Sequence, residues 1–212
     1  MVATLTMGPS FSRFVRAVIE GDIVLTARIL ADNPEFARCR FAEGATRGSP
    51  KDFFIKDIAH YIYRGDTALH LAAAAFQRAT AELLVGRGAD LRAKNRMGAE
   101  PLHYAADTNH TNPVAQSETI AYLISVGSNP NARDANGVAP LHRAVRTRSA
   151  AAVRALLAGG ADMQQKNKNG STALDLVTRN TGRGGSGSAE ARAQQKEIIA
   201  MLLSALQPTS LR

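Results

Sequence analysis

Three histidines stand at equivalent places in a repeated tetrapeptide, and imidazole is the side chain that most often binds zinc in proteins. They are His70, His103 and His142, which are 33 and 39 residues apart. This spacing assigns each histidine to its own unit, about 10 Å from the next if the units are stacked helix pairs. A Zn²⁺ ion needs its ligands at about 2.0–2.1 Å, so one ion could not bind all three. We therefore predict no metal site.

Other reactive side chains lack the partners that catalysis needs. Cys39 is the single cysteine, and no activating motif surrounds it; His60 lies 21 residues further along the chain. Gly182–Ser188 is glycine-rich, but it has no Gly-Lys-Ser/Thr and no preceding strand, so we expect a flexible loop that proteases cut first. No paired-carboxylate or nucleophile-elbow pattern is visible. The sequence predicts no catalytic residues, no cofactor and no enzyme.

The histidine tetrapeptides belong to a longer unit that recurs along the chain. Four copies carry the motif: Thr67–His70, Glu100–His103, Ala139–His142 and Thr172–Asp175. The central leucines are 33, 39 and 33 residues apart. In the clearest copy, Thr67 can cap a first helix, and Gly88-Ala89-Asp90 ends a second helix and begins a loop.

The period, the Leu-His turns and the Gly-Ala-Asp segments resemble the ankyrin repeat, which is a β-turn followed by two short antiparallel helices. Such a unit cannot bury its apolar face alone, so the resemblance implies an all-α solenoid of about five stacked units. It also implies that the three histidines are structural and bond within and between repeat turns. Asp175 takes this place in the last unit, which has fewer neighbours.

We expect a single solenoid domain with atypical ends. Residues 11–40 are predicted to form an N-terminal capping repeat, and residues 65–206 the ankyrin-like repeats with a C-terminal cap. Extra residues are expected at 107–117, and the last helix should resume near Ala189 after the glycine-rich loop. The side chains that should be buried at unit junctions are Leu69, Leu102, Leu141 and Leu156.

Residues 41–64 form an aromatic-rich insertion between the cap and the repeats. They hold five of the eleven aromatic residues, namely Phe41, Phe53, Phe54, Tyr61 and Tyr63. Ser49-Pro50 resembles a helix start, after which Phe54, Ile58, Tyr61 and Ile62 could share one face. Two interpretations stay open: the aromatics seal the N-terminal repeat, or they form a partner-binding lobe.

Composition and charge limit the classes of function. No stretch approaches the ~18 apolar residues that cross a bilayer, and a single cysteine favours a cytoplasmic, reducing location. The net charge is +8, and residues 136–212 hold 11 Lys/Arg against 4 Asp/Glu. Such a localised positive field favours an acidic partner or nucleic acid, although a plain solvated surface can have the same composition.

The resemblance implies that turn tips and first helices form a concave face toward the partner. The residues it places there as partner contacts are Tyr63, Arg64, Arg96, Met97, Arg133, Arg146, Lys166, Lys168 and Arg179. Aromatic and arginine side chains are the usual energetic anchors of interfaces, so Tyr63, Arg96, Arg146 and Arg179 are the preferred candidates. Asp66 is expected on the same face.

Two functions from different classes follow. The leading hypothesis is a non-catalytic scaffold that binds an acidic protein partner on the concave face. The alternative is binding of nucleic acid or another polyanion through the basic C-terminal third. Against the alternative, the lysines and arginines are not interleaved with the stacking aromatics that single-strand binders use. The sequence gives no oligomeric state.

Overall fold

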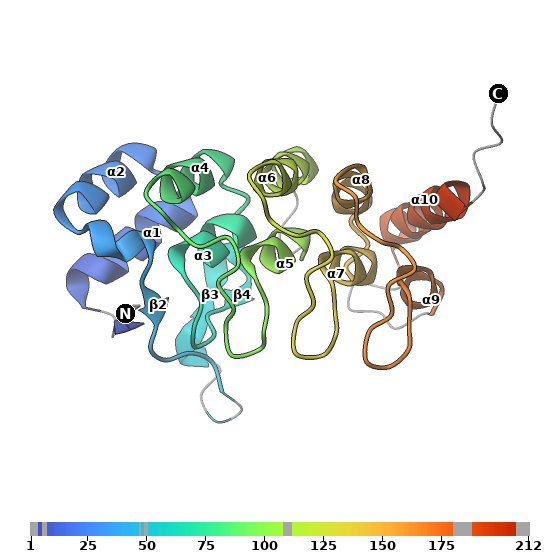
Figure 1. Cartoon of the computed structure of the whole chain (residues 1–212), viewed down its shortest axis with the longest axis horizontal. Helices are drawn as coiled ribbons and strands as arrows, with labels where there is room; N and C mark the ends of the chain where they lie inside the picture. The colour runs from blue at the N-terminus through green and yellow to red at the C-terminus, as the bar shows by residue number, and fades with distance from the viewer. Residues whose placement is uncertain are drawn as a thin grey trace.

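Helix pairs stacked in two rows make up the protein, as the computed structural model shows for residues 4–5, 8–46, 48, 51–107, 112–179 and 188–206 (Figure 1). The inner row consists of α1 (Pro9–Glu20), α3 (Ala68–Ala74), α5 (Pro101–Ala106), α7 (Pro140–Arg146) and α9 (Ala173–Thr178). The outer row consists of α2 (Ile23–Asp32), α4 (Arg78–Gly86), α6 (Pro113–Ser125), α8 (Ala150–Ala158) and α10 (Ala189–Leu206). The all-α repeat solenoid predicted from the sequence is confirmed.

Proline residues and capping side chains begin several of the helices. Proline occupies the first position of α5, α6 and α7, where its missing N–H costs nothing. Asn112 Oδ1 accepts from the Ala115 N–H at 3.1 Å, and Ser149 Oγ accepts from the Ala152 N–H at 3.2 Å. These caps satisfy N–H groups that a helix start leaves without a partner. The last helix begins at Ala189, as expected.

Between one helix pair and the next, the chain forms a finger that stacks on its neighbours. The finger backbones are joined by equivalent bonds: Arg96 N–H to Arg64 O, Ala135 N–H to Met97 O, and Lys168 N–H to Asn136 O, at 2.8–3.1 Å. Gly98 has φ 73°, and a Cβ there would lie 2.7 Å from the Ala135 nitrogen. Close finger stacking therefore requires glycine at this position.

One hydrophobic cluster runs along the stack from Phe11 in α1 to Leu202 in α10. The four leucines expected at unit junctions are all buried, which confirms the register of the repeats. Alanines such as Ala72 and Ala105 are fully buried where helices meet. Small side chains let these short helices approach closely, so little aromatic bulk is needed inside the repeats.

The insertion differs from its prediction. In place of a helix it contains a hairpin of β3 (Phe54–Ile55) and β4 (His60–Tyr61), with 3₁₀ turns at Lys51–Phe53 and Lys56–Ile58. Burial alternates along Ile58–Ile62 with a period of two, which suits a strand and not a helix. Phe54 and Tyr61 are exposed while Ile58 and Ile62 are buried, so the four do not share a face. The predicted helix start, Ser49-Pro50, lies outside the described residues.

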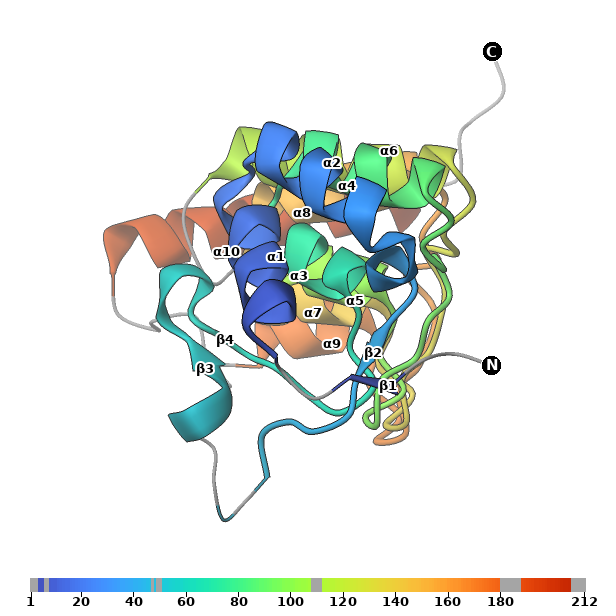
Figure 2. The ribbon, with the colours of Figure 1, turned by 90° about the vertical axis from the view of Figure 1, so that its left-hand side faces the viewer.

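Some aromatic residues of the insertion pack on the N-terminal repeat, and others are exposed as a partner-binding lobe would require. Phe41 is buried in β2 (Arg40–Phe41), which pairs in parallel with β1 (Thr4–Leu5), and its ring centroid lies 5.2 Å from that of Phe11 in the cap. Phe54 and Tyr61 are 41% and 37% exposed, with ring centroids 4.8 Å apart. Figure 2, which looks along the stack, shows the β3–β4 hairpin on the inner-helix side, across from the fingers.

Two further expectations concern parts of the chain that the structure covers only in part. In the glycine-rich loop, Gly182–Gly187 lie outside the described residues, and residues 108–111 of the second insertion do as well.

A third 3₁₀ turn, Pro34–Ala37, connects α2 to the insertion. Among the described helices, none combines the length and the apolar character needed to cross a membrane.

Candidate functional site

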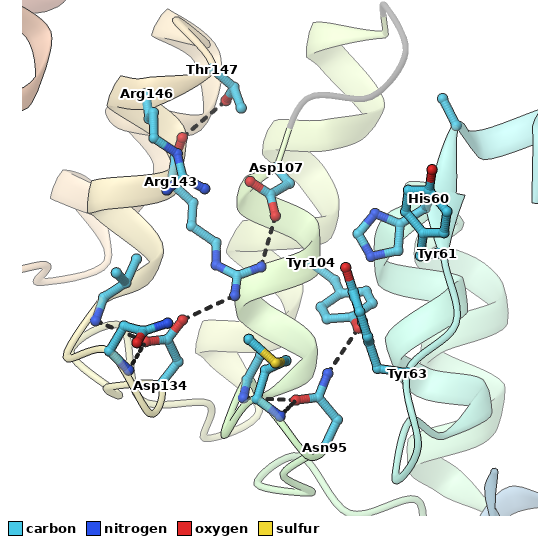
Figure 3. A pocket seen from close by; sticks show the side chains of 15 residues that line it. His60, Tyr61, Tyr63, Asn95, Tyr104, Asp107, Asp134, Arg143, Arg146 and Thr147 are labelled. Carbon is cyan, nitrogen blue, oxygen red and sulfur yellow. Dashed lines mark hydrogen bonds and ion pairs between the residues drawn. The ribbon is translucent and has the colours of Figure 1, made fainter. Parts of the chain in front are cut away.

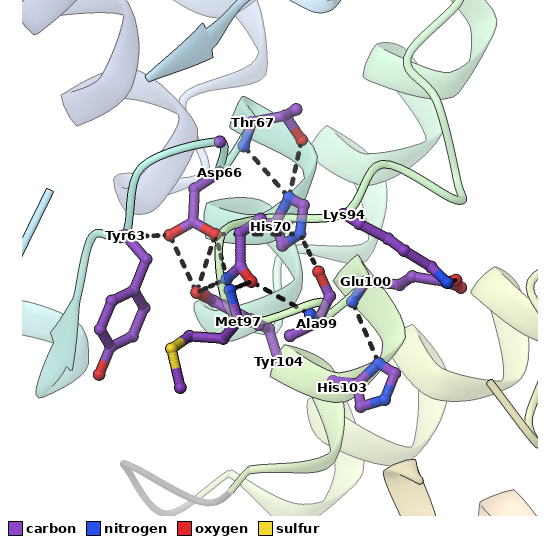
Figure 4. Close-up of polar contacts among 12 residues, drawn as sticks. Tyr63, Asp66, Thr67, His70, Lys94, Met97, Ala99, Glu100, His103 and Tyr104 are labelled. Atoms are coloured by element: carbon purple, nitrogen blue, oxygen red, sulfur yellow. Dashed lines mark hydrogen bonds and ion pairs between the residues drawn. The ribbon is translucent and has the colours of Figure 1, made fainter. Parts of the chain in front are cut away.

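The three histidines form a ladder of hydrogen bonds between successive units. His70 Nδ1 accepts from the Thr67 N–H at 3.1 Å, and its Nε2 donates to the Ala99 carbonyl of the next unit at 3.1 Å (Figure 4). His103 and His142 repeat this pattern, with Nε2 donating to Val138 O at 3.0 Å and Ser171 O at 3.2 Å. Because a backbone N–H faces each Nδ1, the proton must reside on Nε2.

Burial keeps these imidazoles neutral. It lowers the pKa of His70 and of His103 to about 4, and it lowers the pKa of His142 as well. Each ring therefore has its two nitrogens committed to backbone groups at neutral pH. In the part of the chain that the structure describes, no group of three or more His, Cys, Asp or Glu side chains could hold a metal ion.

Asp175 replaces the histidine in the last unit, and among the described residues its side chain bonds only within its own turn. Its Oδ2 accepts from the Thr172 N–H and from Thr172 Oγ1, both at 2.9 Å, and these bonds lower the pKa of the carboxyl. Cys39 shows the opposite effect, since burial raises the pKa of its thiol and disfavours the nucleophilic thiolate.

Asp66 is the first correction to the predicted face, because the structure buries it completely. Its carboxylate accepts from the Tyr63 N–H at 2.7 Å, from Asn95 Nδ2 at 2.8 Å and from the Tyr104 hydroxyl at 2.8 and 2.9 Å (Figure 4). Desolvation raises its pKa to about 6 in spite of these bonds. Asp66 therefore ties the insertion to the first finger and to α5, and it does not face a partner.

Arg143 is a residue of the site that the sequence did not predict. Its Nη1 lies 2.7 Å from Asp107 Oδ2 and its Nη2 lies 3.2 Å from Asp134 Oδ2, so one guanidinium joins two carboxylates from successive units. Arg143 follows His142, as Tyr104 follows His103, whereas the equivalent places in the first and last copies are leucines. A polar residue at a position otherwise held by leucine is the signal that could have revealed both.

A cavity of about 590 Å³ lies in the groove between the fingers, the inner helices and the hairpin. Figure 3 shows its two walls: Arg143 with Asp107 and Asp134 on one side, and the rings of His60, Tyr61, Tyr63 and Tyr104 on the other. The full set of lining residues comes from the hairpin, two fingers, α5 and α7. The cavity thus combines an aromatic wall with a charged wall.

The predicted contact residues divide among this cavity and its surroundings. Tyr63, Met97 and Arg146 line the cavity itself. Arg146 also lines a neighbouring cavity of about 290 Å³ together with Lys168. Arg64 and Arg96 line a third hollow beside the insertion. Outside these cavities, Arg133, Lys166 and Arg179 are exposed at the fingers and at the end of α9.

Arg96 has a structural role that the sequence did not suggest. Its guanidinium carbon lies 5.3 Å from the centre of the Tyr63 ring, and its Nη2 donates to the Ala45 carbonyl. A cation at this distance from an aromatic face is attracted to it. Arg96 therefore holds the insertion and Tyr63 in place, in addition to any contact with a partner.

Comparison with known families agrees with this architecture. A family model described as ankyrin repeats (3 copies) matches residues 114–209, and one described as ankyrin repeat matches residues 64–96. Together these matches span well over half of the chain. No curated protein matches the sequence. Ankyrin repeats generally mediate protein–protein interaction, and proteins built from them are typically non-catalytic. The stacked helix pairs, the histidine ladder and both matches show that the chain belongs to the ankyrin repeat family.

Proposed function

We propose that the protein is a non-catalytic scaffold that binds an acidic protein partner on its concave face. The observation that carries this proposal is the 590 Å³ cavity, because side chains from the hairpin, two fingers and two inner helices converge on it. Concave sites of this size, with apolar walls and a few placed polar groups, are typical places for ligands.

Charge supports an acidic partner over a neutral one. Arg146 and Lys168 line the groove, and Arg133, Lys166 and Arg179 are exposed further along the fingers and α9. Arg133 donates from Nη2 to Lys166 O at 2.6 Å, and Arg179 from Nη1 to Ser171 Oγ at 3.2 Å. A guanidinium has five N–H donors, so these bonds leave donors for a partner. Rim charges of one sign speed association with an oppositely charged protein.

The proposed contact set spans the length of the groove. Arg146, Lys168 and Arg179 set the rate of association, whereas Tyr63 and Met97 provide apolar contact and set residence time. The remaining members are Arg64, Arg96, Arg133 and Lys166. We keep the division into a capping repeat (11–40), an insertion (41–64) and repeats (65–206), and a cytoplasmic location supported by the single cysteine.

The test is selection from a random peptide display library on the immobilised whole chain. We expect enrichment of peptides rich in Asp and Glu, and slower association when Arg146 and Lys168 are changed to Glu. Arg28→Glu on the outer helix α2 is the matched control, because Arg28 is exposed and far from the groove lining. Enrichment of neutral or basic peptides would contradict the proposal.

The basic C-terminal third also suggests nucleic-acid binding as a second candidate. A protein that neutralises phosphates loses affinity linearly in the logarithm of salt concentration, with a slope near −0.9 per contact. Titration of duplex DNA at several salt concentrations therefore separates the two. Weak binding that hardly changes with salt would remove the second candidate.

A further inference from the structure

We propose that the β3–β4 hairpin turns one end of the concave groove into a socket for an aromatic side chain, and that this residue lies next to carboxylates in an extended segment of the partner. The inference rests on the proposed function and makes it specific. The hairpin belongs to the insertion and not to the repeating unit, so the period of the repeats does not provide this socket.

The hairpin side of the cavity provides flat apolar surface. Tyr61 from β4 and Tyr63 line it, and Met97 extends it from the first finger. Tyr61 is 37% exposed, and Met97 and Tyr63 are each partly exposed, so these side chains are accessible from the groove. Aromatic rings prefer offset or edge-to-face neighbours, and sulfur also contacts rings favourably. An aromatic side chain of the partner fits this wall best.

The wall is also pre-organised. The Tyr63 N–H is held by Asp66 Oδ2 at 2.7 Å, and its ring is held by Arg96. The Ile62 carbonyl accepts from the Ala45 N–H at 2.7 Å, and the Ile62 N–H donates to Phe53 O at 2.8 Å. A surface that is fixed before binding loses little conformational entropy when it is occupied.

The groove beyond the opposite wall accepts a carboxylate. Asp107 and Asp134 both lie against Arg143, which offsets one of their two negative charges. Arg146 lies beside them and lines both the large cavity and the smaller one that contains Lys168. In the described part of the chain, the smaller cavity is lined by Arg146 and Lys168 and by no acidic residue, so a carboxylate of the partner that follows the bound ring meets these two cations there.

The order of these groups predicts a sequence pattern in the partner. The two cavities share Asn136, Val138 and Arg146 as lining residues, so they adjoin each other along the concave face. The aromatic subsite lies at the hairpin end, and the cationic subsite lies toward the C-terminal units. The partner segment should thus carry one aromatic residue at one end and acidic residues at the other.

The experiment is a coupling measurement on peptides from the display selection described above. An enriched acidic peptide that contains an aromatic residue is synthesised together with its aromatic-to-alanine version, and both are titrated against the wild-type chain and the Tyr61→Ser variant. We expect Tyr61→Ser to weaken the aromatic peptide about tenfold or more, and the alanine peptide less than about twofold. A tenfold change corresponds to about 1.4 kcal/mol.

Ile23→Ser is the control. Ile23 is also an exposed apolar residue, but it lies on the outer helix α2 and lines neither cavity of the groove. It should leave both titrations unchanged. Enrichment of acidic peptides without an aromatic residue, or equal losses for both peptides with Tyr61→Ser, would overturn the socket and leave the acidic-partner proposal standing. Enrichment of neutral or basic peptides, or no enrichment, would overturn both.

Discussion

The repeats from α3 to α9 and the insertion before them are stabilised by different kinds of contact. In the repeats one arrangement recurs: a histidine bonds to the N–H three residues earlier and to a carbonyl of the next unit. The insertion is held by contacts that occur once, such as Tyr63 N–H to Asp66 and Arg96 over Tyr63. Periodic positions stabilise the stack, and residues that break the period shape the cavity.

The largest effect should come from a periodic core residue. Leu102→Ala should lower the free energy of unfolding by roughly 2–5 kcal/mol, because it removes buried apolar surface and leaves a cavity. Urea denaturation followed by circular dichroism measures this loss. Val114→Ala is the control, since Val114 is exposed on α6. A loss below about 1 kcal/mol for Leu102→Ala would show that the repeat register is wrong.

Arg143 tests whether a residue that breaks the period can also stabilise the stack. Arg143→Ala should cost about 3 kcal/mol, because it leaves Asp107 and Asp134 largely buried without their cation. The matched control is Arg154→Ala, which removes an exposed ion pair with Glu197 and should cost at most about 1 kcal/mol. Equal losses in urea denaturation would mean that the two ion pairs of Arg143 stabilise the stack no more than the exposed pair of Arg154 does.

Leu102 and Arg143 also show how much of the structure can be predicted from the sequence. The leucine at 102 is predictable, because its period, its motif and its need for burial all agree. Arg143 is not, because its partners come from α5 and from the finger that precedes α7, and only the stacked geometry brings them together. Asp66 was assigned to the surface for the same reason: a charged residue at a turn tip is ordinarily exposed, and its three partners are not visible in the chain order.

The prediction for the insertion was wrong for a different reason. Ser49-Pro50 suggested a helix start, and the spacing of Phe54, Ile58, Tyr61 and Ile62 fits a helical face. The burial pattern follows the alternation of a strand. A short segment with both spacings cannot be decided from sequence, and the 3₁₀ turns on either side of β3 depend on tertiary contacts. The sequence therefore identified the aromatic residues of the insertion, but it did not predict that some of them form a wall of the groove.

Acidification should weaken the repeats. The pKa of His70 and of His103 is about 4 in the folded chain against 6.5 when unfolded, so the unfolded chain binds more protons between these values and stability falls as pH drops. Asp66 opposes this: its folded pKa of about 6 exceeds 3.8, so its contribution is gained as pH falls through 6. The two histidines outweigh one aspartate.

Urea midpoints at pH 7 and about pH 5 test this balance. We expect a lower midpoint at the acidic pH, and a larger fall in Asp66→Asn, which removes the opposing contribution. A midpoint that rises on acidification would mean that Asp66, which belongs to the insertion's network, and not the histidine ladder dominates the titration.

The smallest effect should come from the hairpin surface. Phe54→Ser should change the free energy of unfolding by less than about 0.5 kcal/mol, because the ring is 41% exposed and contacts mainly Tyr61. Thermal or urea denaturation measures this. A loss above about 1 kcal/mol would make the hairpin part of the core and would weaken the distinction between the two regions.

The histidine ladder has a direction, and this matters while the chain is being made. Each Nε2–H bonds to a carbonyl that comes 29 or 35 residues later, so a unit completes its own turn only after its successor has been synthesised. A ribosome releases the chain from its N-terminus, and the early units therefore emerge with this donor still facing water. Asp175 needs no later residue, so the last turn can close by itself. During synthesis, each Nε2–H bond of the ladder can therefore form only after the following unit has been added to the chain.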